Sequence, residues 1–330
     1  MKITLNNLNI AAISSVVPKN KVSISSFYDR FGKNEVDRIS RNTGIKYLRI
    51  APRNYKTSDF CIASAKHLFA MTGMKNNVID AIIFVSQTSD YRMPATSCII
   101  QNRLGLSKNS LAFDINYGCS GYIYGLYQAA LLISSNSCRK VLLCVGDTMT
   151  QHLDPHDQKT QLILGDAASA TLIEKGCNSW SFDIRTDGSG YKNLIIDKKE
   201  NNLDGYLQMD GAAIMEFALR EVPEVIESVI REKTWSKDNI DQVIFHQANT
   251  FILNYLRKKT GFSKDKVPIA VENYGNTGPA SISLTLSHYA DMYKTKKLNK
   301  VVIAGFGVGL SWGAVALSLK ETNLINVIEV

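Results

Sequence analysis

The sequence predicts an α/β protein built from two similar halves. Runs of apolar, largely β-branched residues alternate with patterns typical of helices, which favours layers of strands and helices. Most of these runs are apolar at every position, as expected for strands of a mostly parallel sheet with helices on both faces. Four segments of the first half also recur in the second half, so an internal repeat supports the same fold class.

The four pairs of repeated segments share their order and their approximate spacing along the chain. They are 80–89 with 241–250, 111–130 with 269–290, 139–148 with 299–309, and 168–175 with 313–320. We therefore expect two βαβ-rich halves, residues 1–175 and residues 176–330, paired about a pseudo-twofold axis.

The expected elements follow from these patterns in chain order. Residues 1–20 have no uninterrupted apolar block after Lys2, so they are expected to form a first strand and not a signal peptide. The run LAFDIN (111–116) is expected to be a strand, followed by a helix from about Ser120 to Ser134. Because ligands bind beyond the carboxyl ends of the strands in such sheets, the residues that follow each strand are candidates for the site.

Composition and charge argue against several classes of protein. No apolar stretch reaches the roughly 18 to 20 uncharged residues of a membrane helix, so no membrane association is expected. The six cysteines form no C-x-x-C pair, which predicts reduced thiols in a cytoplasmic protein without disulfides or a zinc site. The net charge of +8 is spread thinly, so no nucleic-acid partner is expected. In HLDPHD (152–157), Pro155 interrupts the helix that a metal site would need.

Cys119 is the first candidate for chemistry. In DINYGCSGYIYG (114–125) it lies between two glycines, where an apolar run changes into a helical pattern. A thiol at a helix N-terminus is close to the positive end of the helix dipole, which favours the thiolate. Cys119 is therefore a candidate nucleophile, and the alternative is a buried, inert cysteine.

Two further candidates come from the second half. VENYGNTGPASISL (271–284) repeats the Asn-Tyr-Gly corner, and Asn276 takes the place that Cys119 has in the first copy. Its carboxamide offers N–H donors that suit stabilisation of a developing oxyanion, although Asn is also an ordinary turn residue. His246 ends the strand in VIFHQAN, where the first copy has Val85. An imidazole there can exchange a proton or polarise a carbonyl, and the alternative is a histidine satisfied by backbone groups.

The glycine-rich segment GFGVGLSWG (305–313) follows the apolar run VVIA. It is not the G-x-G-x-x-G pattern of a dinucleotide site, because position 310 is Leu. Its backbone N–H groups are instead candidates for an oxyanion hole.

With a glycine-flanked cysteine, HQAN and YGNTGPAS in that order, the chain resembles the β-ketoacyl-acyl-carrier-protein synthase III family of the thiolase superfamily. NTGIKYLRIAP (42–52) and DPHDQKTQLILGDAASATLI (154–173) are similar to further family signatures, as is GFGVGLSWG. The resemblance implies a five-layered α-β-α-β-α fold, a homodimer, and a catalytic triad of Cys119, His246 and Asn276. Elongating synthases carry a second His where this chain has Asn276.

The resemblance also implies a mechanism. An acyl thioester would transfer its acyl group to Cys119, with the backbone N–H groups of Cys119 and Val308 forming the oxyanion hole. A malonyl thioester, carried by acyl carrier protein, would then lose carbon dioxide while His246 and Asn276 hold the enolate oxygen. No cofactor and no metal are expected, since coenzyme A or carrier-protein thioesters are substrates.

Further positions follow from the same resemblance. Met93, contributed by the partner subunit, and Gly211 correspond to the bottom of the acyl pocket. Asn249 corresponds to a position that binds the thioester carrier, and Lys258 and Lys259 match a basic pair that docks carrier protein.

The chain departs from the family where coenzyme A would be held. Arg38 and Asn42 stand at the positions of a Trp and an Arg that clamp adenine, and Gln158 replaces a further arginine. Phe251 replaces a basic residue of the docking surface. We therefore expect a weaker or altered coenzyme A site, which leaves either coenzyme A or carrier protein as the carrier of the acyl donor.

Two other functions fit the same residues. The acyl group of acyl-Cys119 could pass to an amine or a hydroxyl in a specialised pathway. Alternatively, the chain could be a non-catalytic partner subunit, although its complete triad argues against that role. The sequence leaves open the acyl group, its carrier and the pathway.

Overall fold

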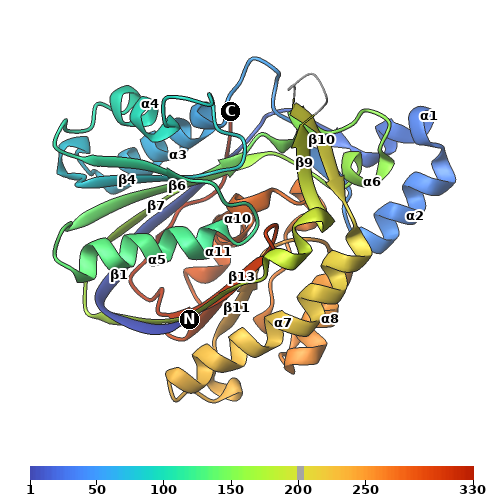
Figure 1. The fold of residues 1–330 in the computed structure, drawn as a ribbon. Coiled ribbons are helices and arrows are strands. Elements are labelled where there is room, and N and C mark those ends of the chain that lie inside the picture. Colours follow the sequence, from blue (N-terminus) through green and yellow to red (C-terminus); the bar gives the residue numbers. More distant parts are fainter. Residues whose placement is uncertain (199–203) are drawn as a thin grey trace.

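The computed structural model describes residues 1–198 and 204–330, and Figure 1 shows a large central sheet with helices on and between its parts. In the described residues this sheet has eleven strands, of which nine form one continuous path. In order along the path they are β11 (Gln242–Phe245), β12 (Val301–Gly307), β13 (Ser311–Leu317), β8 (Asn178–Thr186), β1 (Lys2–Val17), β7 (Ala167–Lys175), β6 (Lys140–Asp147), β4 (Ala81–Val85) and β5 (Leu111–Ile115). Two short strands, β14 (Asn323–Leu324) and β15 (Ile328–Glu329), pair with β1.

The strand order is mirrored about the contact between β1 and β8. It reads β1-β7-β6-β4-β5 outward on one side and β8-β13-β12-β11 on the other. On both sides the inner pairs are antiparallel and the outer pairs are parallel. This order is compatible with a division of the chain at residue 175, which itself stays a prediction.

The second half lacks the strand that would correspond to β5. The repeat leads one to expect a strand near residues 269–272, but the chain forms the short helix α9 (Val271–Tyr274) there. Pro268 has no N–H group to donate to a ladder, which disfavours a strand at this position.

Strand β1 belongs to both sides of the sheet. Its first part, from Lys2 to Leu8, pairs with β8, and its second part, from Leu8 to Val16, pairs with β7. The register shifts between residues 5 and 8 and again between residues 10 and 12, and Asn7 has a φ of 63°. These irregularities let a single strand continue from one half of the sheet into the other.

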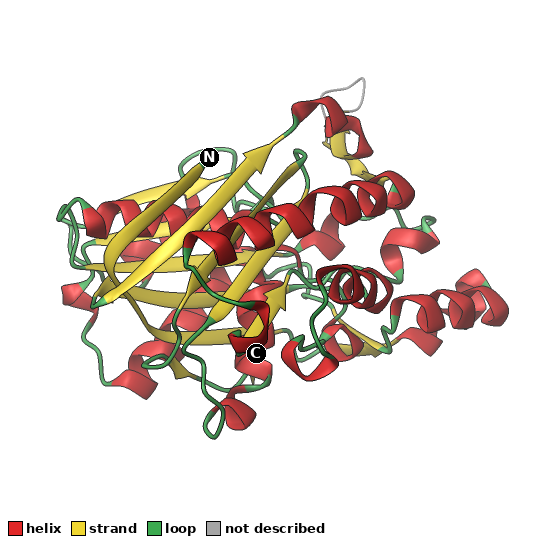
Figure 2. Ribbon diagram, turned by 90° about the horizontal axis from the view of Figure 1, so that it is seen from below, coloured by secondary structure: helices red, strands yellow, loops and turns green. Residues whose placement is uncertain are grey.

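The helices complete five layers, α-β-α-β-α (Figures 1 and 2). Helices α5 (Gly121–Ser134) and α10 (Ser281–His288) form the middle layer and contact strands of both halves. Helix α3 (Thr57–Thr72) covers β1, β6 and β7 from outside, beside α4 (Thr96–Arg103), and α7 (Gly211–Glu232) covers β12 and β13 beside α8 (Thr250–Thr260). Buried side chains fill both faces of the strands. In β4, Ile83 and Val85 pack on the middle layer, while Ile82 and Phe84 pack on the outer one.

The other elements are short. The strands are β2 (Lys21–Ser23), β3 (Tyr47–Arg49), β9 (Leu194–Lys198) and β10 (Asp204–Met209). The α-helices are α1 (Tyr28–Phe31), α2 (Lys33–Thr43), α6 (Gln158–Gln161) and α11 (Ala290–Tyr293). The 3₁₀ helices are η1 (Ile24–Phe27), η2 (Asn76–Val78), η3 (Met149–His152), η4 (Gly188–Asn193), η5 (Lys237–Asn239), η6 (Lys264–Lys266) and η7 (Gly278–Ala280).

The elements expected from the sequence agree with this structure at several points. β1 confirms the first strand, and β5 followed by α5 confirms the strand and the helix around Cys119. None of the helices in the described part of the chain is long and apolar enough to cross a membrane.

Candidate active site

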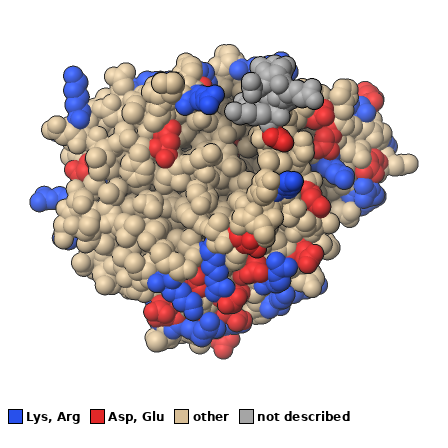
Figure 3. Space-filling view, viewed as in Figure 1, with Lys and Arg blue, Asp and Glu red and all other residues tan. Residues whose placement is uncertain are grey.

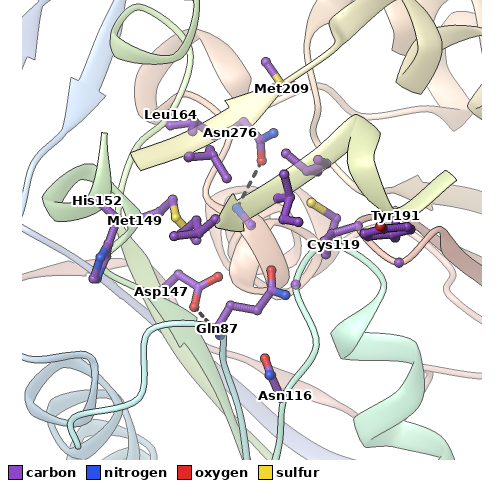
Figure 4. Close-up of a pocket in the computed structure, with 18 residues that line it drawn as sticks. Gln87, Asn116, Cys119, Asp147, Met149, His152, Leu164, Tyr191, Met209 and Asn276 are labelled. Atoms are coloured by element: carbon purple, nitrogen blue, oxygen red, sulfur yellow. Dashed lines mark hydrogen bonds between the residues drawn. The ribbon is translucent and has the colours of Figure 1, made fainter. Parts of the chain in front are cut away.

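A cavity of about 460 Å³ lies at the carboxyl ends of the strands, and Figure 4 shows the side chains around it. Both halves of the chain contribute to its wall. Cys119 and Asp147 come from the first half, and Asn276, Gly278 and Val308 come from the second. The structure therefore brings the thiol and the carboxamide, which are far apart in sequence, to one cavity.

Cys119 lies in the turn between β5 and α5. The backbone N–H groups of Val308 and of Cys119 itself both interact with its sulfur. These are the two groups that the sequence assigned to an oxyanion hole, and that role stays a prediction. The segment around Val308 approaches closely because residue 307 is glycine. A Cβ added there would lie 2.7 Å from the Cβ and 3.0 Å from the Sγ of Cys119, so no larger residue fits.

The Cys119 thiol is protonated in the free protein. Burial, together with the negative charge of Asp147, raises its pKa to about 12, although the two backbone N–H groups act in the opposite direction. The expectation of a thiolate is therefore wrong for the free protein, because burial outweighs the effect of the two backbone N–H groups on the thiol pKa.

His246 follows β11 and is buried, with 2% of its surface exposed. Its Nδ1 lies 2.8 Å from the hydroxyl oxygen of Ser281, and its ring packs edge-on against Phe306 with centroids 5.4 Å apart. Burial lowers its pKa to about 3, so the imidazole is neutral, and a hydrogen bond with the Gly278 backbone acts in the opposite direction. His246 is not among the described residues that line the cavity, but it contacts Gly278, which does.

Asn276 is held by its own backbone and by its side-chain oxygen. Its N–H donates to the carbonyl of Ile163 at 2.8 Å, and its carbonyl accepts from Gly165 at 3.0 Å. Its Oδ1 accepts a hydrogen bond of 3.0 Å from the N–H of Gly278, which Figure 4 shows as a dashed line. This bond leaves the NH₂ group of the carboxamide as a donor for a ligand, in agreement with the sequence interpretation.

The sequence does not single out Asp147, although this residue lies at the end of an expected strand, where candidates for the site are found. Asp147 ends β6, has 3% of its surface exposed and lines the cavity. Burial raises its pKa to about 6, and hydrogen bonds from Ser86, Gln87 and Thr88 limit the rise. The signal was an acidic residue at the end of an apolar strand, but nothing in the sequence identifies its partners.

One wall of the cavity is apolar. It is formed by Met149, Leu164, Val308 and the pair of strands β9 and β10, which contribute Leu194, Ile196, Leu207 and Met209. Met149 and His152 lie at one side of this space, and Cys119 lies at the other (Figure 4). This wall could not be predicted from the sequence, because it depends on how strands β9 and β10 pack over the strand ends.

The two acyl-pocket residues expected from the sequence do not line this cavity. Met93 is 82% exposed, and its expected contribution to a partner subunit's pocket stays a prediction. Gly211 is the first residue of α7, and a Cβ added there would meet nothing within 4 Å. Met209, two residues earlier, lines the cavity in its place.

The residues expected to hold the thioester carrier lie outside this cavity. Arg38 makes two hydrogen bonds to Glu35, of 2.5 and 2.8 Å, and Asn42 is exposed near the end of α2. Asn249 caps α8, where its Oδ1 accepts from the N–H of Ile252 at 2.8 Å. Their role in binding coenzyme A or phosphopantetheine stays a prediction.

The pair Lys258 and Lys259 lies in the last turn of α8, and both residues are exposed. Lys259 donates to the carbonyl of Leu219 at 2.7 Å. In Figure 3 charged side chains of both signs gather at the lower edge of the molecule, and a broad face above them carries few charges. Among residues 1–198 and 204–330, no group of three or more His, Cys, Asp or Glu could hold a metal ion.

Comparison with known proteins identifies a family over most of the chain. Residues 113–188 match the family model for 3-oxoacyl-[acyl-carrier-protein] synthase III, and residues 230–319 match the model for its C-terminal part. The β-ketoacyl-[acyl-carrier-protein] synthase III of Oceanobacillus iheyensis is 32% identical, over 94% of this chain and 98% of that protein. The enzyme of the same name from Clostridium perfringens is 31% identical, over 96% and 100%.

A solved structure is similar over the full length. The crystal structure of a 3-oxoacyl-(acyl-carrier protein) synthase from Burkholderia xenovorans has a TM-score of 0.96 and 35% identity, and covers 100% of this chain and 99% of that one. These similarities extend over both halves and over every element that builds the cavity. The chain belongs to the β-ketoacyl-acyl-carrier-protein synthase III family and has its thiolase-like fold.

Proposed function

We propose that this protein condenses an acyl thioester with a malonyl thioester, with loss of carbon dioxide, to give a β-ketoacyl thioester. The sulfur of Cys119 attacks the acyl thioester and carries the acyl group. Decarboxylation of the malonyl group leaves an enolate, whose carbon attacks acyl-Cys119 and releases the product. The main observation in support of this reaction is that Cys119, its two backbone N–H donors and the Asn276 carboxamide lie at a single cavity. The names of the similar proteins support the same reaction.

The charges around the cavity suit a decarboxylation. No Lys or Arg is among the described residues that line it, so the malonyl carboxylate has no cation to stabilise it there. The donors assigned to the enolate oxygen, the neutral imidazole of His246 and the carboxamide of Asn276, carry no charge. They gain strength as charge develops on that oxygen, which lowers the barrier to carbon dioxide loss.

The acyl group that fits is apolar. Leu164, Leu194, Ile196 and Leu207 form a wall that offers no hydrogen-bonding side chain to a chain extending from Cys119. Burial of each additional methylene against such a wall contributes about 0.8 kcal/mol. We therefore propose an acyl chain longer than acetyl as the preferred donor.

We further propose that acyl carrier protein delivers the malonyl group and that the acyl donor also arrives on carrier protein. Arg38, at the position expected to contact coenzyme A, is bound to Glu35 by two hydrogen bonds, and Gln158 donates to the same carboxylate at 3.2 Å. The arginine therefore has to leave an ion pair before it could bind a phosphate. A coenzyme A donor that acylates Cys119 as fast as the matching carrier-protein donor would contradict this proposal.

We propose a homodimer as the working form of the enzyme. β5 is an edge strand of the large sheet, and Leu111 at its start is 50% exposed. Tyr91 and Met93, in the segment between β4 and α4, are 53% and 82% exposed. A second copy of the chain would cover these apolar side chains, and light scattering measures the resulting mass.

The test of the reaction uses the intact protein. Mass spectrometry after incubation with acyl thioesters of increasing chain length should show a single acyl group on Cys119. Addition of malonyl-acyl carrier protein should then release carbon dioxide and remove the acyl group from the protein. Transfer of the acyl group to an amine or hydroxyl without carbon dioxide release would refute the condensation.

A further inference from the structure

Asp147 is a buried carboxylate in the cavity that the proposed mechanism does not use. It lies at the end of β6, and Figure 4 shows it below Met149 and beside Gln87, with Cys119 farther to the right. It is the one Asp or Glu among the described residues that line the cavity. A buried charged group in a reaction cavity calls for a physical account, because burial of a charge is costly.

The two oxygens of Asp147 have different surroundings. Oδ1 accepts four hydrogen bonds, from the Ser86 hydroxyl at 2.8 Å, the Gln87 N–H at 2.8 Å, and the N–H and hydroxyl of Thr88 at 3.2 and 3.0 Å. Oδ2 accepts none from the residues that the structure describes. It lies 3.0 Å from the position that a Cβ on Gly278 would occupy, and the N–H of Gly278 is the group that binds the Asn276 side chain. The side chain is thus fixed through one oxygen, and its other oxygen faces the Asn276 side of the cavity.

We propose that the ionised Asp147 carboxylate destabilises the carboxylate of the second substrate and so promotes its loss as carbon dioxide. This inference rests on the proposed function. With no Lys or Arg among the described residues of the wall, two carboxylates share a space of low polarity, where their repulsion is only weakly screened. The repulsion is relieved as the bond between the carboxylate carbon and the α-carbon breaks, because the charge moves to the enolate oxygen held by Asn276 and His246.

The step balances in atoms and electrons. The electron pair of the broken carbon–carbon bond stays on the α-carbon, and carbon dioxide leaves as a neutral molecule. The α-carbon then forms a bond to the acyl carbonyl of Cys119, the carbon–sulfur bond breaks, and the sulfur leaves as a thiolate that takes a proton from water. Asp147 gains and loses no proton in this sequence.

The negative charge of Asp147 opposes the first half-reaction, in which the acyl group is transferred to Cys119, while it promotes the second, the decarboxylation and condensation. Asp147 is one of the causes that raise the pKa of the Cys119 thiol, so it opposes formation of the thiolate that accepts the acyl group. After acylation the sulfur is part of a neutral thioester, and this cost disappears.

The pKa of Asp147, about 6, leaves it ionised at neutral pH. Among the described residues, the other titratable groups that face it or its cavity are Cys61 from α3, His152 from η3, Asp166 from the segment before β7 and Tyr191 from η4, besides Cys119.

The test is the isosteric variant Asp147→Asn, in which the retained oxygen keeps its place among the donors of residues 86–88. Alkylation of Cys119 by iodoacetamide at fixed pH should become faster, by up to about tenfold, because the thiol pKa falls. Carbon dioxide release from a malonyl thioester by the acylated enzyme should become about 10- to 100-fold slower. That range corresponds to two unit charges about 6 to 12 Å apart at an effective dielectric constant of about 20.

Asp166→Asn is the matched control. Asp166 is also fully buried, and its pKa is also raised to about 6, but it is not a lining residue of the cavity. Its variant should not separate the two half-reactions. Asp147→Asn would overturn the inference if carbon dioxide release stayed at the native rate, or if a folded variant lost both half-reactions together.

A measurement on the native enzyme covers the case in which the variant does not fold. Carbon dioxide release by the acylated enzyme should decline as the pH falls through about 6, while the substrate carboxylate is still ionised. A flat profile between pH 5 and 8 would overturn the inference. A native enzyme that releases no carbon dioxide from any malonyl thioester would instead refute the proposed function itself.

Discussion

Asn276→Ala should separate the two half-reactions of the enzyme. The backbone bonds of Asn276 to residues 163 and 165 do not depend on its side chain, so the corner keeps its shape. The variant loses the bond from Gly278 to Oδ1, which costs about 1 kcal/mol of stability at this half-buried position. It also loses the NH₂ donor to the enolate oxygen, which raises the barrier to condensation by about 3 to 4 kcal/mol, or roughly 10²- to 10³-fold in rate.

The assay follows both steps in one reaction. Mass spectrometry gives the rate of acylation of Cys119, which should stay within about threefold of the native rate, since the role proposed for Asn276 concerns only the second substrate. Trapped carbon dioxide gives the rate of condensation. Asn273→Ala is the control, because Asn273 lies three residues earlier and does not line the cavity. Loss of acylation together with condensation in Asn276→Ala, but not in the control, would refute this division of labour.

Three further predictions concern neighbouring residues. Ser281→Ala should slow condensation by about tenfold and spare acylation, because it removes the hydroxyl that lies 2.8 Å from Nδ1 of the His246 imidazole and positions that ring. Ser281→Thr should restore the rate. Gly307→Ala should reduce acylation by about 100-fold, since its Cβ would displace the Cys119 sulfur, whereas Gly188→Ala, with nothing within 4 Å, should not. Burial raises the pKa of Asp166, so this residue contributes stability that is complete below about pH 4 and lost as the pH rises through 6. Urea denaturation of Asp166→Asn should accordingly show a smaller decline in unfolding free energy between pH 4 and 7 than the native protein shows.

Residues next to strand ends could be predicted from the sequence because their placement depends on local pattern and on a general rule. An apolar run followed by glycines and a helical pattern is enough to put Cys119 at a strand end, and the repeat puts Asn276 at the equivalent corner. The topology of such sheets then brings the strand ends together.

Properties that depend on burial could not be predicted in this way. The thiol pKa of Cys119 is set by desolvation and by Asp147, and both require knowledge of what packs around the sulfur. The apolar wall from β9 and β10 depends on a hairpin that folds back over the strand ends. The short helix α9, where the repeat predicts a counterpart of β5, shows the limit of the repeat itself, because similar sequence segments form different structures in the two halves.

The strand β1 sets a limit on how the enzyme can move. Because its backbone pairs with β8 at one end and with β7 at the other, β1 joins the half of the sheet that carries Cys119 to the half that carries Asn276. A hinge motion that separated the two halves would break the backbone hydrogen bonds of β1 with β7 or with β8 in every catalytic cycle. Any movement that admits substrates or releases products therefore has to occur in elements outside the large sheet, such as β9 and β10, which form part of the cavity wall.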